Sequence, residues 1–402
     1  MRLIITVVSI ALLGPASAEW NQWRGEGRDG KSSETGLLRT WPDGGPELVW
    51  RSDSLGAGYS SLAAADGMVL TQGFREGRQL LIALDAETGA TLWETAHGGR
   101  YSNRRGDGPR GTPTVDGDRV YALGGDGNLI CAEGATGDRI WETNLLKAYG
   151  GRNIRWGISE SPLVDGDRIV VNAGGGGASV VALDKMTGAE LWKTQSDRAG
   201  YSSAIAAEAG GVRQYVVFTG EGAVGVRADN GELLWRYGRA GNSTANIATP
   251  VVRDDLVFLS SSYGTGCALL RLESDDGSVT ASEVYFSRDM RNHYSSSVLI
   301  GGFLYGFSGR ILTAMEFETG EVAWRDRSVG KGQIVYGDGR LYILSEDGVV
   351  GLVEPDPAGY REISRFEIGT GGHPTWTLPV LSGGRLYLRD QSRLYAFDVT
   401  GR

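Results

Sequence analysis

Along this chain a short apolar run, a polar turn and a second apolar run recur at regular spacing. In the first clear copy, the apolar run 80–84 precedes a turn-forming segment at 85–89, and Leu92 and Trp93 centre the strand that follows. This arrangement predicts a β-hairpin. Related copies occur at 132–141, 183–192, 226–235 and 315–324, each with a glycine four residues before a tryptophan. A hairpin of this size cannot bury its own apolar face, so the copies must pack on one another.

A second signal keeps the same spacing: a turn with glycine or aspartate at the bend, followed by a strand of alternating apolar residues. It occurs eight times, beginning near residues 66, 116, 165, 210, 253, 301, 337 and 383. Glycine and aspartate at the bend are typical of hairpin turns, and the spacing is near that of other propeller repeats. We therefore predict an all-β protein, an eight-bladed β-propeller.

Three copies of the tryptophan hairpin are irregular. At 272–281 the aromatic position is Ala281, at 353–363 it is Ile363, and the last copy, 394–402, ends before any tryptophan strand. At the other end of the chain, 46–51 is a strand with Trp50 but without a hairpin partner. We expect this strand to pair with 394–398, so that one blade is built from both termini and two open sheet edges disappear.

The hairpins resemble the tryptophan-docking motif of the quinoprotein alcohol dehydrogenase-like propellers, also called PQQ-like repeats, whose pattern is Ala-x-Asp-x-x-x-Gly-x-x-x-Trp. The resemblance runs from about residue 46 to the end, and it implies that each tryptophan docks between neighbouring blades. A docking motif is scaffold, so it indicates the fold and not the activity. The structural docking residues that it implies are Trp50, Asp85, Gly89, Trp93, Trp141, Asp184, Gly188, Trp192, Trp235, Gly320 and Trp324.

Residues 1–18 have the pattern of a cleavable secretory signal. Arg2 forms the basic start, 3–14 the apolar stretch, and 16–18 the small-residue cleavage site. The apolar stretch is too short to span a bilayer, and Glu19 stands where a lipoprotein needs cysteine. We expect a periplasmic or secreted protein that does not insert into a membrane.

Residues 19–45 are polar and rich in glycine, with Trp20, Trp23 and Trp41 as anchors. We interpret them as an N-terminal strap packed across the outside of the ring. The run Trp20-Asn-Gln-Trp-Arg-Gly25 is also similar to the lead-in of many bacterial PQQ-like repeat proteins. The predicted domains are therefore a signal peptide at 1–18, the strap at 19–45 and the propeller at 46–402.

Composition narrows the choice of partners. Without the leader the chain has 39 basic and 49 acidic residues, a net charge of −10, which argues against nucleic acid as a partner. Cys131 and Cys267 lie three repeats apart in a closed ring, beyond the roughly 7 Å Cα reach of a disulfide. We expect two buried free thiols and a monomeric protein.

The loops that cross from one blade to the next are the candidate binding region. Together they contain 18 basic and 9 acidic residues, so they predict a cationic mouth on an acidic body that attracts anions. Arginine beside tyrosine, tryptophan and asparagine suits a carboxylate, sulfate or phosphate. The alternative is that these arginines only bridge adjacent blades, since exposed loops collect charge. The candidate ligand-binding residues are Arg104, Arg105, Arg110, Arg152, Asn153, Arg155, Trp156, Arg291, Asn292, His293, Lys331 and Trp376.

Signals for catalysis are sparse. His97, His293 and His373 lack the spacing of metal ligands, and no nucleophile motif occurs. Asp107 and Glu160 are a weaker acid/base candidate, because nothing in the sequence fixes their separation. We therefore expect no catalytic residue and no metal.

Three functions from different classes compete. The first, which we favour, is a non-enzymatic exported propeller that binds a protein partner, an anionic small molecule or a glycan, similar in role to the propeller scaffold of outer-membrane protein assembly. The second is a PQQ-dependent dehydrogenase. The resemblance implies that such enzymes need adjacent cysteines and a calcium site of Glu and Asn, so PQQ with calcium is expected only under this alternative. The third is a carbohydrate-binding or carbohydrate-cleaving propeller.

Overall fold

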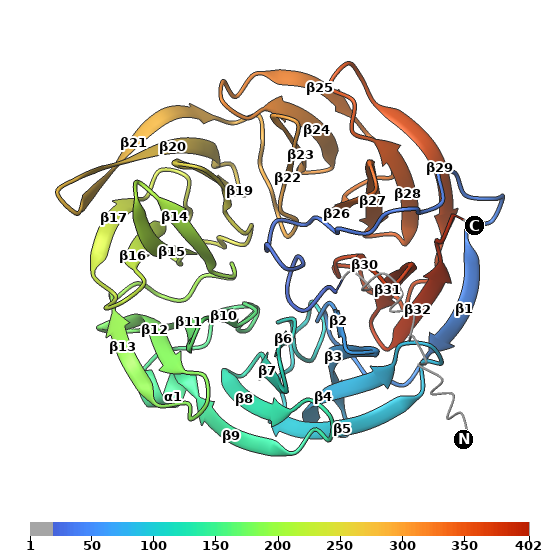
Figure 1. Cartoon of the computed structure of the whole chain (residues 1–402), viewed down its shortest axis with the longest axis horizontal. Coiled ribbons are helices and arrows are strands. Elements are labelled where there is room, and N and C mark those ends of the chain that lie inside the picture. Colours follow the sequence, from blue (N-terminus) through green and yellow to red (C-terminus); the bar gives the residue numbers. More distant parts are fainter. Residues whose placement is uncertain (1–18, 402) are drawn as a thin grey trace, which may run out of the picture.

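Eight four-stranded antiparallel sheets surround a common axis, in the order of the chain (Figure 1). A computed structural model describes residues 19–401, and the signal predicted for residues 1–18 lies outside that range. Each sheet is one blade of a propeller. The predicted all-β, eight-bladed fold is therefore confirmed.

The blades are numbered along the chain from the first complete one. The strands of blades one to four are β2 (Ala63–Ala65), β3 (Met68–Arg75), β4 (Arg78–Asp85), β5 (Thr91–Gly98), β6 (Thr114–Asp116), β7 (Arg119–Leu123), β8 (Asn128–Glu133), β9 (Arg139–Asn144), β10 (Leu163–Asp165), β11 (Arg168–Gly175), β12 (Ala178–Asp184), β13 (Glu190–Thr194), β14 (Ile205–Ala209), β15 (Val212–Phe218), β16 (Ala223–Arg227) and β17 (Leu233–Tyr237). The one helix within residues 19–401, α1 (Leu145–Tyr149), follows β9.

The second half of the ring repeats the plan. The strands of blades five to eight are β18 (Val251–Arg253), β19 (Leu256–Ser261), β20 (Gly266–Asp275), β21 (Ser278–Ser287), β22 (Val298–Ile300), β23 (Phe303–Ser308), β24 (Ile311–Glu316), β25 (Val322–Asp326), β26 (Gly332–Gly337), β27 (Arg340–Ser345), β28 (Val349–Glu354), β29 (Arg361–Glu367), β30 (Val380–Ser382), β31 (Arg385–Asp390), β32 (Arg393–Asp398) and β1 (Glu47–Ser52).

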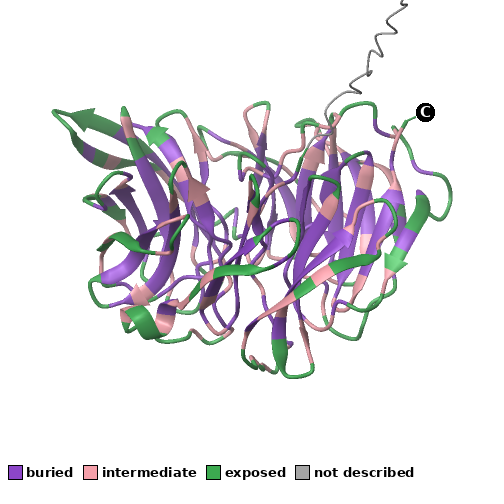
Figure 2. Ribbon diagram, turned by 60° about the horizontal axis from the view of Figure 1, so that its bottom comes forward, coloured by how far each residue is buried: buried purple, intermediate pink, exposed green. Residues whose placement is uncertain are grey.

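Strand direction divides the ring into two ends. The first strand of each blade lies nearest the axis and the fourth lies at the rim, where exposure is greatest (Figure 2). Because neighbouring strands are antiparallel, the turn between the second and third strands emerges at the same end as the crossing to the next blade. We call this end the open end and the opposite one the closed end.

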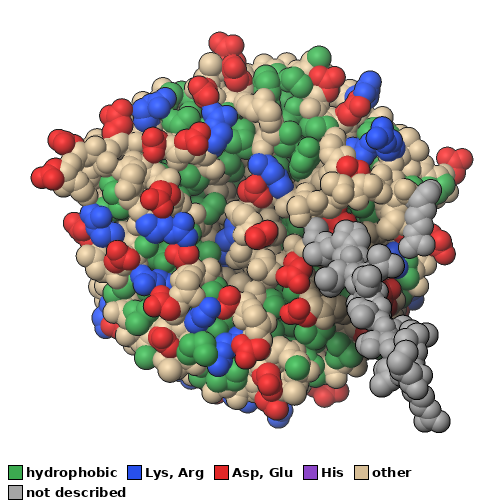
Figure 3. All heavy atoms as spheres, viewed as in Figure 1, with side chains coloured by type: hydrophobic (Ala, Val, Ile, Leu, Met, Phe, Trp, Pro, Cys, Tyr) green, Lys and Arg blue, Asp and Glu red, His purple; other side chains and the backbone are tan. Residues whose placement is uncertain are grey.

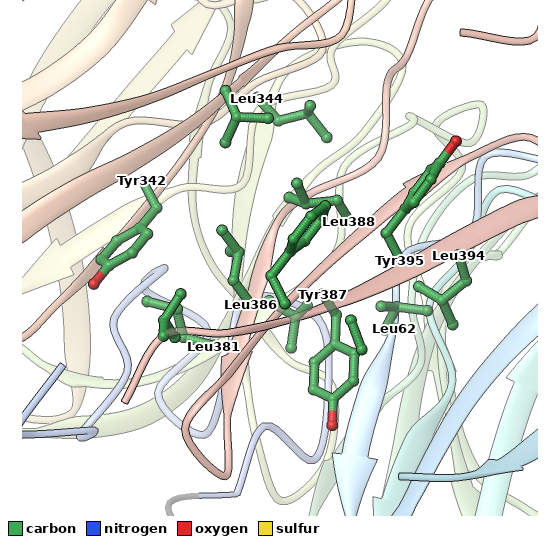
Figure 4. Packing of buried hydrophobic residues seen from close by; sticks show 14 of the residues in the cluster. Leu62, Tyr342, Leu344, Leu381, Leu386, Tyr387, Leu388, Leu394 and Tyr395 are labelled. Carbon is green, nitrogen blue, oxygen red and sulfur yellow. The ribbon is translucent and has the colours of Figure 1, made fainter. Parts of the chain in front are cut away.

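Blade eight closes the ring as predicted. β1 pairs antiparallel with β32, with Trp50 opposite Ala396 and Arg51 opposite Tyr395. Closure joins the two ends of the chain in one sheet, so neither β1 nor β32 leaves an unpaired inner edge. Its core extends into both neighbouring blades, where Leu344 of blade seven and Leu62 before blade one join the leucines and tyrosines of β31 and β32 (Figure 4).

The docking tryptophans bridge neighbouring blades. Gly89 receives the ring of Trp50, and a Cβ added to this glycine would lie 2.5 Å from a ring carbon, at a φ of +72° that favours glycine. Five indole N–H groups donate to a backbone carbonyl of the next blade, in the pairs Trp50–Ala86, Trp93–Gly134, Trp141–Lys185, Trp192–Ala228 and Trp324–Asp356. Trp50 and Trp235 are buried, and the other four keep partial exposure.

The aspartates of the motif shape the turns. The Asp85 carboxylate accepts hydrogen bonds from the backbone N–H and the hydroxyl of Thr88, and Asp184 does the same with Thr187. These bonds lower the pKa of both carboxyl groups. Trp235 departs from the pattern, because its indole N–H donates to Gln214 of its own blade at 2.6 Å.

Blade five retains an aromatic docking residue, so the interpretation that Ala281 occupies that position is wrong. The hairpin β20–β21 is longer than the others, and its register places Tyr285 opposite Leu269, as Trp324 lies opposite Ala314. The Tyr285 ring packs on Gly320, and its hydroxyl donates to the carbonyl of Phe317 in blade six at 3.0 Å. The aromatic residue of blade five is therefore retained, and the longer hairpin places it later in the sequence than the pattern of the other blades predicts.

In blade seven the N-terminal segment supplies the aromatic residue. A register shift after Leu352 places Ser364, and not Ile363, at the docking position. Trp41 donates its backbone N–H to Ser364 Oγ at 3.0 Å, and its ring centroid lies 6.0 Å from that of Tyr342. The same separation joins Trp324 to Tyr305 within blade six. The sequence interpretation of Ile363 is therefore wrong.

The N-terminal segment enters the ring with Trp20 to Lys31, and its end reaches the rim, where Trp41 packs on β29. The prediction that all of residues 19–45 lies on the outside is therefore wrong. Figure 1 shows the segment crossing the centre of the propeller. Trp20 forms a β-bridge with Ala64 of blade one, and Lys31 forms one with Tyr336 of blade seven. Composition could not indicate this location, because the first strands offer carbonyl oxygens that only the assembled ring brings together.

Three further features complete the description of the fold. Cys131 and Cys267 are buried free thiols in blades two and five, as expected. On the face that Figure 3 shows, basic side chains are interspersed with acidic ones and do not gather into one patch. Within residues 19–401, no helix has the length and apolar character needed to cross a membrane.

Candidate functional site

A pocket of about 570 Å³ occupies the axis of the ring at its open end. We call it the well. Crossing loops from several blades and turns between second and third strands line it, and Trp23 of the N-terminal segment contributes to its wall. The lining residues are Trp23, Tyr59, Arg105, Arg110, Trp156, Ser159, Ser161, Tyr201, Ser203, Ile247, Tyr263, His293, Tyr294, Arg310, Lys331, Gln333, Glu346, Pro374 and Trp376.

Seven rings form a nearly continuous collar around the well. Consecutive ring centroids lie between 4.9 and 6.4 Å apart. Together they present apolar faces on which a flat ligand can stack. In order around the collar they are Tyr59, Trp376, Tyr294, His293, Tyr263, Trp156 and Tyr201.

The chain itself holds the polar edges of these rings. Trp376 donates its indole N–H to Glu346 at 2.8 Å, and the hydroxyl of Tyr263 lies 2.8 Å from Nε2 of His293. The hydroxyl of Tyr59 donates to the carbonyl of Arg105. These bonds fix ring orientation, so the collar is preorganised for a ligand.

Positive charge exceeds negative charge in the well. Lys331 pairs with Glu346 at 2.8 Å, and Glu346 is the one carboxylate among the lining residues. Arg110 donates to backbone carbonyls of its own loop and lies over the ring of Tyr101 at 4.5 Å, and burial lowers its pKa. Arg105 and Arg310 are exposed, and neither side chain has a hydrogen-bond or ion-pair partner within residues 19–401.

His293 contributes a neutral ring. Burial, and then the charge of Lys331, lower the pKa of His293 to about 4. Its Nδ1 is buried and has no hydrogen-bond partner in the part of the chain that the structure describes. The excess of positive charge therefore comes from arginine and lysine alone at neutral pH.

A second pocket, the groove, lies beside the well at the open end and has a volume of about 600 Å³. Tyr201 lines both pockets. Arg152, Asn153 and Arg155 line the groove, and the guanidinium of Arg155 lies 5.2 Å from the ring centroid of Trp156, which lines the well. The two pockets are therefore neighbours.

The structure divides the twelve predicted binding residues among three locations. The well is lined by Arg105, Arg110, Trp156, His293, Lys331 and Trp376, and the groove by Arg152, Asn153 and Arg155. Arg104 and Arg291 are exposed and line neither pocket. Asn292 is buried and serves the fold, since it donates to the carbonyl of Phe307 and accepts from the hydroxyl of Ser297.

Sequence reasoning missed Tyr263, Arg310, Glu346 and Trp23 as lining residues. The first three lie on turns between second and third strands, whereas the candidates were sought only on crossing loops. The signal was present, because antiparallel pairing places both kinds of connection at one end. Trp23 could not be found in this way, since its position depends on the N-terminal segment entering the ring, where its indole N–H donates to Thr249 at 2.9 Å.

Below the well, the buried carboxyl group of Glu160 and the buried guanidinium of Arg28 interact electrostatically. The Glu160 carboxylate accepts the backbone N–H of Asn172 at 2.6 Å, and burial raises its pKa to about 8. Arg28 donates to the carbonyls of Ala204 and Ser161, and burial lowers its pKa. Asp107 instead accepts hydrogen bonds in its own loop, from Ser102 and from the backbone N–H of Asn103. Throughout residues 19–401, no three His, Cys, Asp or Glu side chains come together as a metal site.

An eight-bladed ring with aromatic residues docked between blades defines this chain as a propeller of PQQ-like repeats. The chain belongs to the family whose model is described as "Outer membrane protein assembly factor BamB", which matches residues 42–144 and 78–326.

Individual proteins show the same likeness. The chain is 29% identical over 219 residues to an outer membrane protein assembly factor BamB of Kangiella koreensis, covering 52% of this chain and 49% of that protein. It is also 29% identical over 192 residues to the BamB of Xanthomonas campestris pv. campestris, covering 46% and 42%. The chain thus spans about half the length of the curated relatives it matches.

Among solved structures, a quinohemoprotein alcohol dehydrogenase from Pseudomonas putida HK5 superposes with a TM-score of 0.67 at 13% identity. The match covers 96% of this chain and 81% of that chain. At this identity the likeness concerns the fold alone.

Proposed function

We propose that this protein is an exported, non-enzymatic scaffold or binding module that holds an anionic ligand or a protein partner at the open end of its propeller. The single observation that carries the proposal is the well, with a collar of seven rings and four cationic side chains against one carboxylate. Preformed, largely apolar pockets with a few charged groups are typical ligand sites.

The groups in the well favour binding over catalysis. Lys331 and Trp376 both donate to Oε1 of Glu346, and these two bonds hold its carboxylate in a fixed orientation. His293 is neutral, and its Nε2 faces the hydroxyl of Tyr263. A general base needs a free lone pair within reach of a substrate proton, and these contacts support a rigid binding surface.

The residues do not fit PQQ with calcium. Calcium takes six to eight oxygen ligands, usually including several carboxylates, whereas Glu346 is the one carboxylate lining the well. The quinone enzymes that the repeats resemble also place adjacent cysteines against the cofactor, and here the two thiols lie in separate blades. We propose that the well takes neither the quinone nor the ion.

The biological setting is proposed from the relatives' names and from the predicted signal. Two relatives are outer membrane protein assembly factors, so we propose that this chain acts in the periplasm as a monomeric scaffold in envelope assembly. The net charge of −9 disfavours nucleic acid. Deletion of the gene in its own host should lower the amount of folded outer-membrane protein, and an unchanged amount would contradict this part of the proposal.

Ligand binding is tested with the purified chain in thermal unfolding, because a ligand of the native state raises apparent stability. The probes are galacturonate, citrate, neutral galactose, and PQQ with calcium. We expect the anions to raise the unfolding midpoint in a concentration-dependent way and the other two to leave it unchanged. The Arg105→Gln/Arg310→Gln variant should lose most of this rise, whereas Arg291→Gln, which removes the same type of charge outside both pockets, should keep it.

Two results would overturn the binding proposal. One is an unfolding midpoint that neither anion raises at any concentration that the assay can measure. The other is saturable reduction of a dye by the chain with PQQ, calcium and a simple alcohol, which would make the protein a dehydrogenase.

A further inference from the structure

The groove beside the well has the composition of a second recognition site. Arg152, Arg155 and Arg198 line it, together with small polar residues such as Ser243 and Thr244, and its lining contains no carboxylate. The nearest acid to Arg198 is Glu221, at 4.0 Å, and both side chains of this pair are about half exposed. An exposed pair of this kind contributes little to stability, so Arg198 remains available to a ligand.

The donors of the groove are largely uncommitted. The side chains of Arg152 and Arg155 have no hydrogen-bond or ion-pair partner within residues 19–401. Arg155 makes a cation–π contact with the ring of Trp156. The hydroxyls of Ser243 and Thr244 are exposed, and neither forms a hydrogen bond within the described chain. Arg198 uses one donor, which bonds the carbonyl of Gly220 at 3.2 Å. The three guanidinium groups and two hydroxyls therefore retain unused hydrogen-bonding capacity.

The loop that carries these hydroxyls is held in place. Oδ1 of Asn242 accepts the backbone N–H groups of Thr244 at 2.8 Å and Ala245 at 2.9 Å. Its Nδ2 donates to Ser261 of the neighbouring turn at 3.1 Å. The groove wall is thus preorganised, which lowers the entropic cost of binding.

The groove continues into the well. Tyr201 lines both pockets, and Arg155 in the groove lies on Trp156 of the collar. A ligand that stacks on the collar can therefore extend toward the three arginines without leaving the protein surface.

We propose that the well and the groove form one elongated site for an acidic oligosaccharide, an inference that rests on the proposed function. One sugar unit stacks its apolar C–H face on the collar beside Trp156, whose ring also carries the guanidinium of Arg155. The carboxylate of a following unit binds Arg152 and Arg198, because guanidinium groups match carboxylates. The hydroxyls of the sugar bind the free hydroxyls of Ser243 and Thr244.

A peptide fits these observations less well. A bound peptide needs partners for its backbone N–H and carbonyl groups, and the polar edges of Tyr59, Tyr263 and Trp376 in the collar are already bonded to the chain. Ring faces, hydroxyls and guanidinium groups instead match the faces, hydroxyls and carboxylates of a uronate-containing sugar.

The test measures binding of trigalacturonate, monomeric galacturonate and neutral maltotriose by isothermal titration calorimetry to the full chain. We expect trigalacturonate to bind at least about tenfold more tightly than the monomer, since charged hydrogen bonds in the groove add to stacking in the well. The Arg152→Gln/Arg198→Gln variant should lose that advantage and bind the monomer as the wild type does. The Arg291→Gln variant should retain it, and added salt should reduce it.

The outcomes separate this inference from the function on which it rests. If galacturonate binds in a way that depends on Arg105 and Arg310 but trigalacturonate gains nothing, the elongated site is wrong and the proposed function stands. If neither sugar acid nor citrate binds, the ligand proposals both fail. Tighter binding of the peptide Tyr-Glu-Glu than of trigalacturonate would show that the assignment to a sugar is wrong.

Discussion

Inside the ring, Arg24 and Arg28 bind the protein, whereas at the open end Arg105 and Arg310 face solvent. Arg24 and Arg28 of the N-terminal segment are buried and donate to carbonyl oxygens of Ser297, Ala204 and Ser161 in three different blades. Arg105 and Arg310 line the well and have no hydrogen-bond or ion-pair partner within residues 19–401.

The difference teaches how to separate structural from ligand-binding arginines in a propeller. A buried guanidinium depends on the protein for its partners, because unpaired donors away from water are costly, and Arg24 and Arg28 satisfy most of their donors in this way. An exposed one is satisfied by water and can exchange that water for an anion. Clustered arginines in the sequence therefore do not reveal a binding site until burial is known.

The largest expected effect concerns the inner arginines. Arg28→Ala leaves the carbonyls of Ala204 and Ser161 without this donor and removes the charge beside Glu160. We expect the free energy of unfolding to fall by about 3–5 kcal/mol in urea denaturation. Arg310→Ala, in the exposed wall of the well, should change it by less than about 0.5 kcal/mol. Equal losses for the two variants would show that buried and exposed arginines do not differ in their contribution to stability.

A comparable loss is expected for the aromatic residue that the N-terminal segment supplies to blade seven. Trp41 is buried against Tyr342 and Phe366, so Trp41→Ala should lower the free energy of unfolding by about 3–5 kcal/mol. Trp192→Ala, at a regular docking site, should cost a similar amount. Leu191→Ala, a neighbour that is 46% exposed, serves as the control and should be nearly neutral. A loss below about 1 kcal/mol for Trp41→Ala would mean that the segment only rests on the blade.

A third effect should link pH to the buried Glu160 beside Arg28. The pKa of Glu160 is about 8 in the folded protein, against 4.5 without perturbation. Between these values the folded protein keeps a proton that the unfolded chain has released, so stability is highest below about pH 4.5 and falls as pH rises toward 8. Denaturation at pH 5 to 8 should show this decline in the wild type and a weaker one in Glu160→Gln. The exposed Glu208→Gln should match the wild type, and identical profiles for all three would contradict the raised pKa.

The smallest effect is expected at the open end. Because the pKa of His293 is about 4, the ring stays neutral from pH 7 to 5.5 and adds no charge to the well. Calorimetric affinity for galacturonate should therefore change less than about twofold over this range. A rise in affinity on acidification, with a midpoint near 6.5 and absent in His293→Gln, would show that the ring titrates normally and that the positive charge of the well depends on pH.

Local patterns in the sequence determined the number of blades, the closure by β1 and β32, and the regular docking residues. Alternation of apolar residues, turn chemistry and the fixed distance from glycine to tryptophan are short-range properties, so they can be read without coordinates. The crossing loops also indicated the end at which Arg105, Lys331 and Trp376 meet.

Other features depended on tertiary structure because they are set by register and by contacts between distant segments. Tyr285 became a docking residue through a longer hairpin, and Trp41 through a contact more than 300 residues away in sequence. The collar combines rings from connections that follow different strands, and its ring separations follow from closure of the whole ring. Sequence alone determined which residue types were available, whereas the tertiary structure decided which arginines are buried against carbonyls and which remain free to bind a ligand.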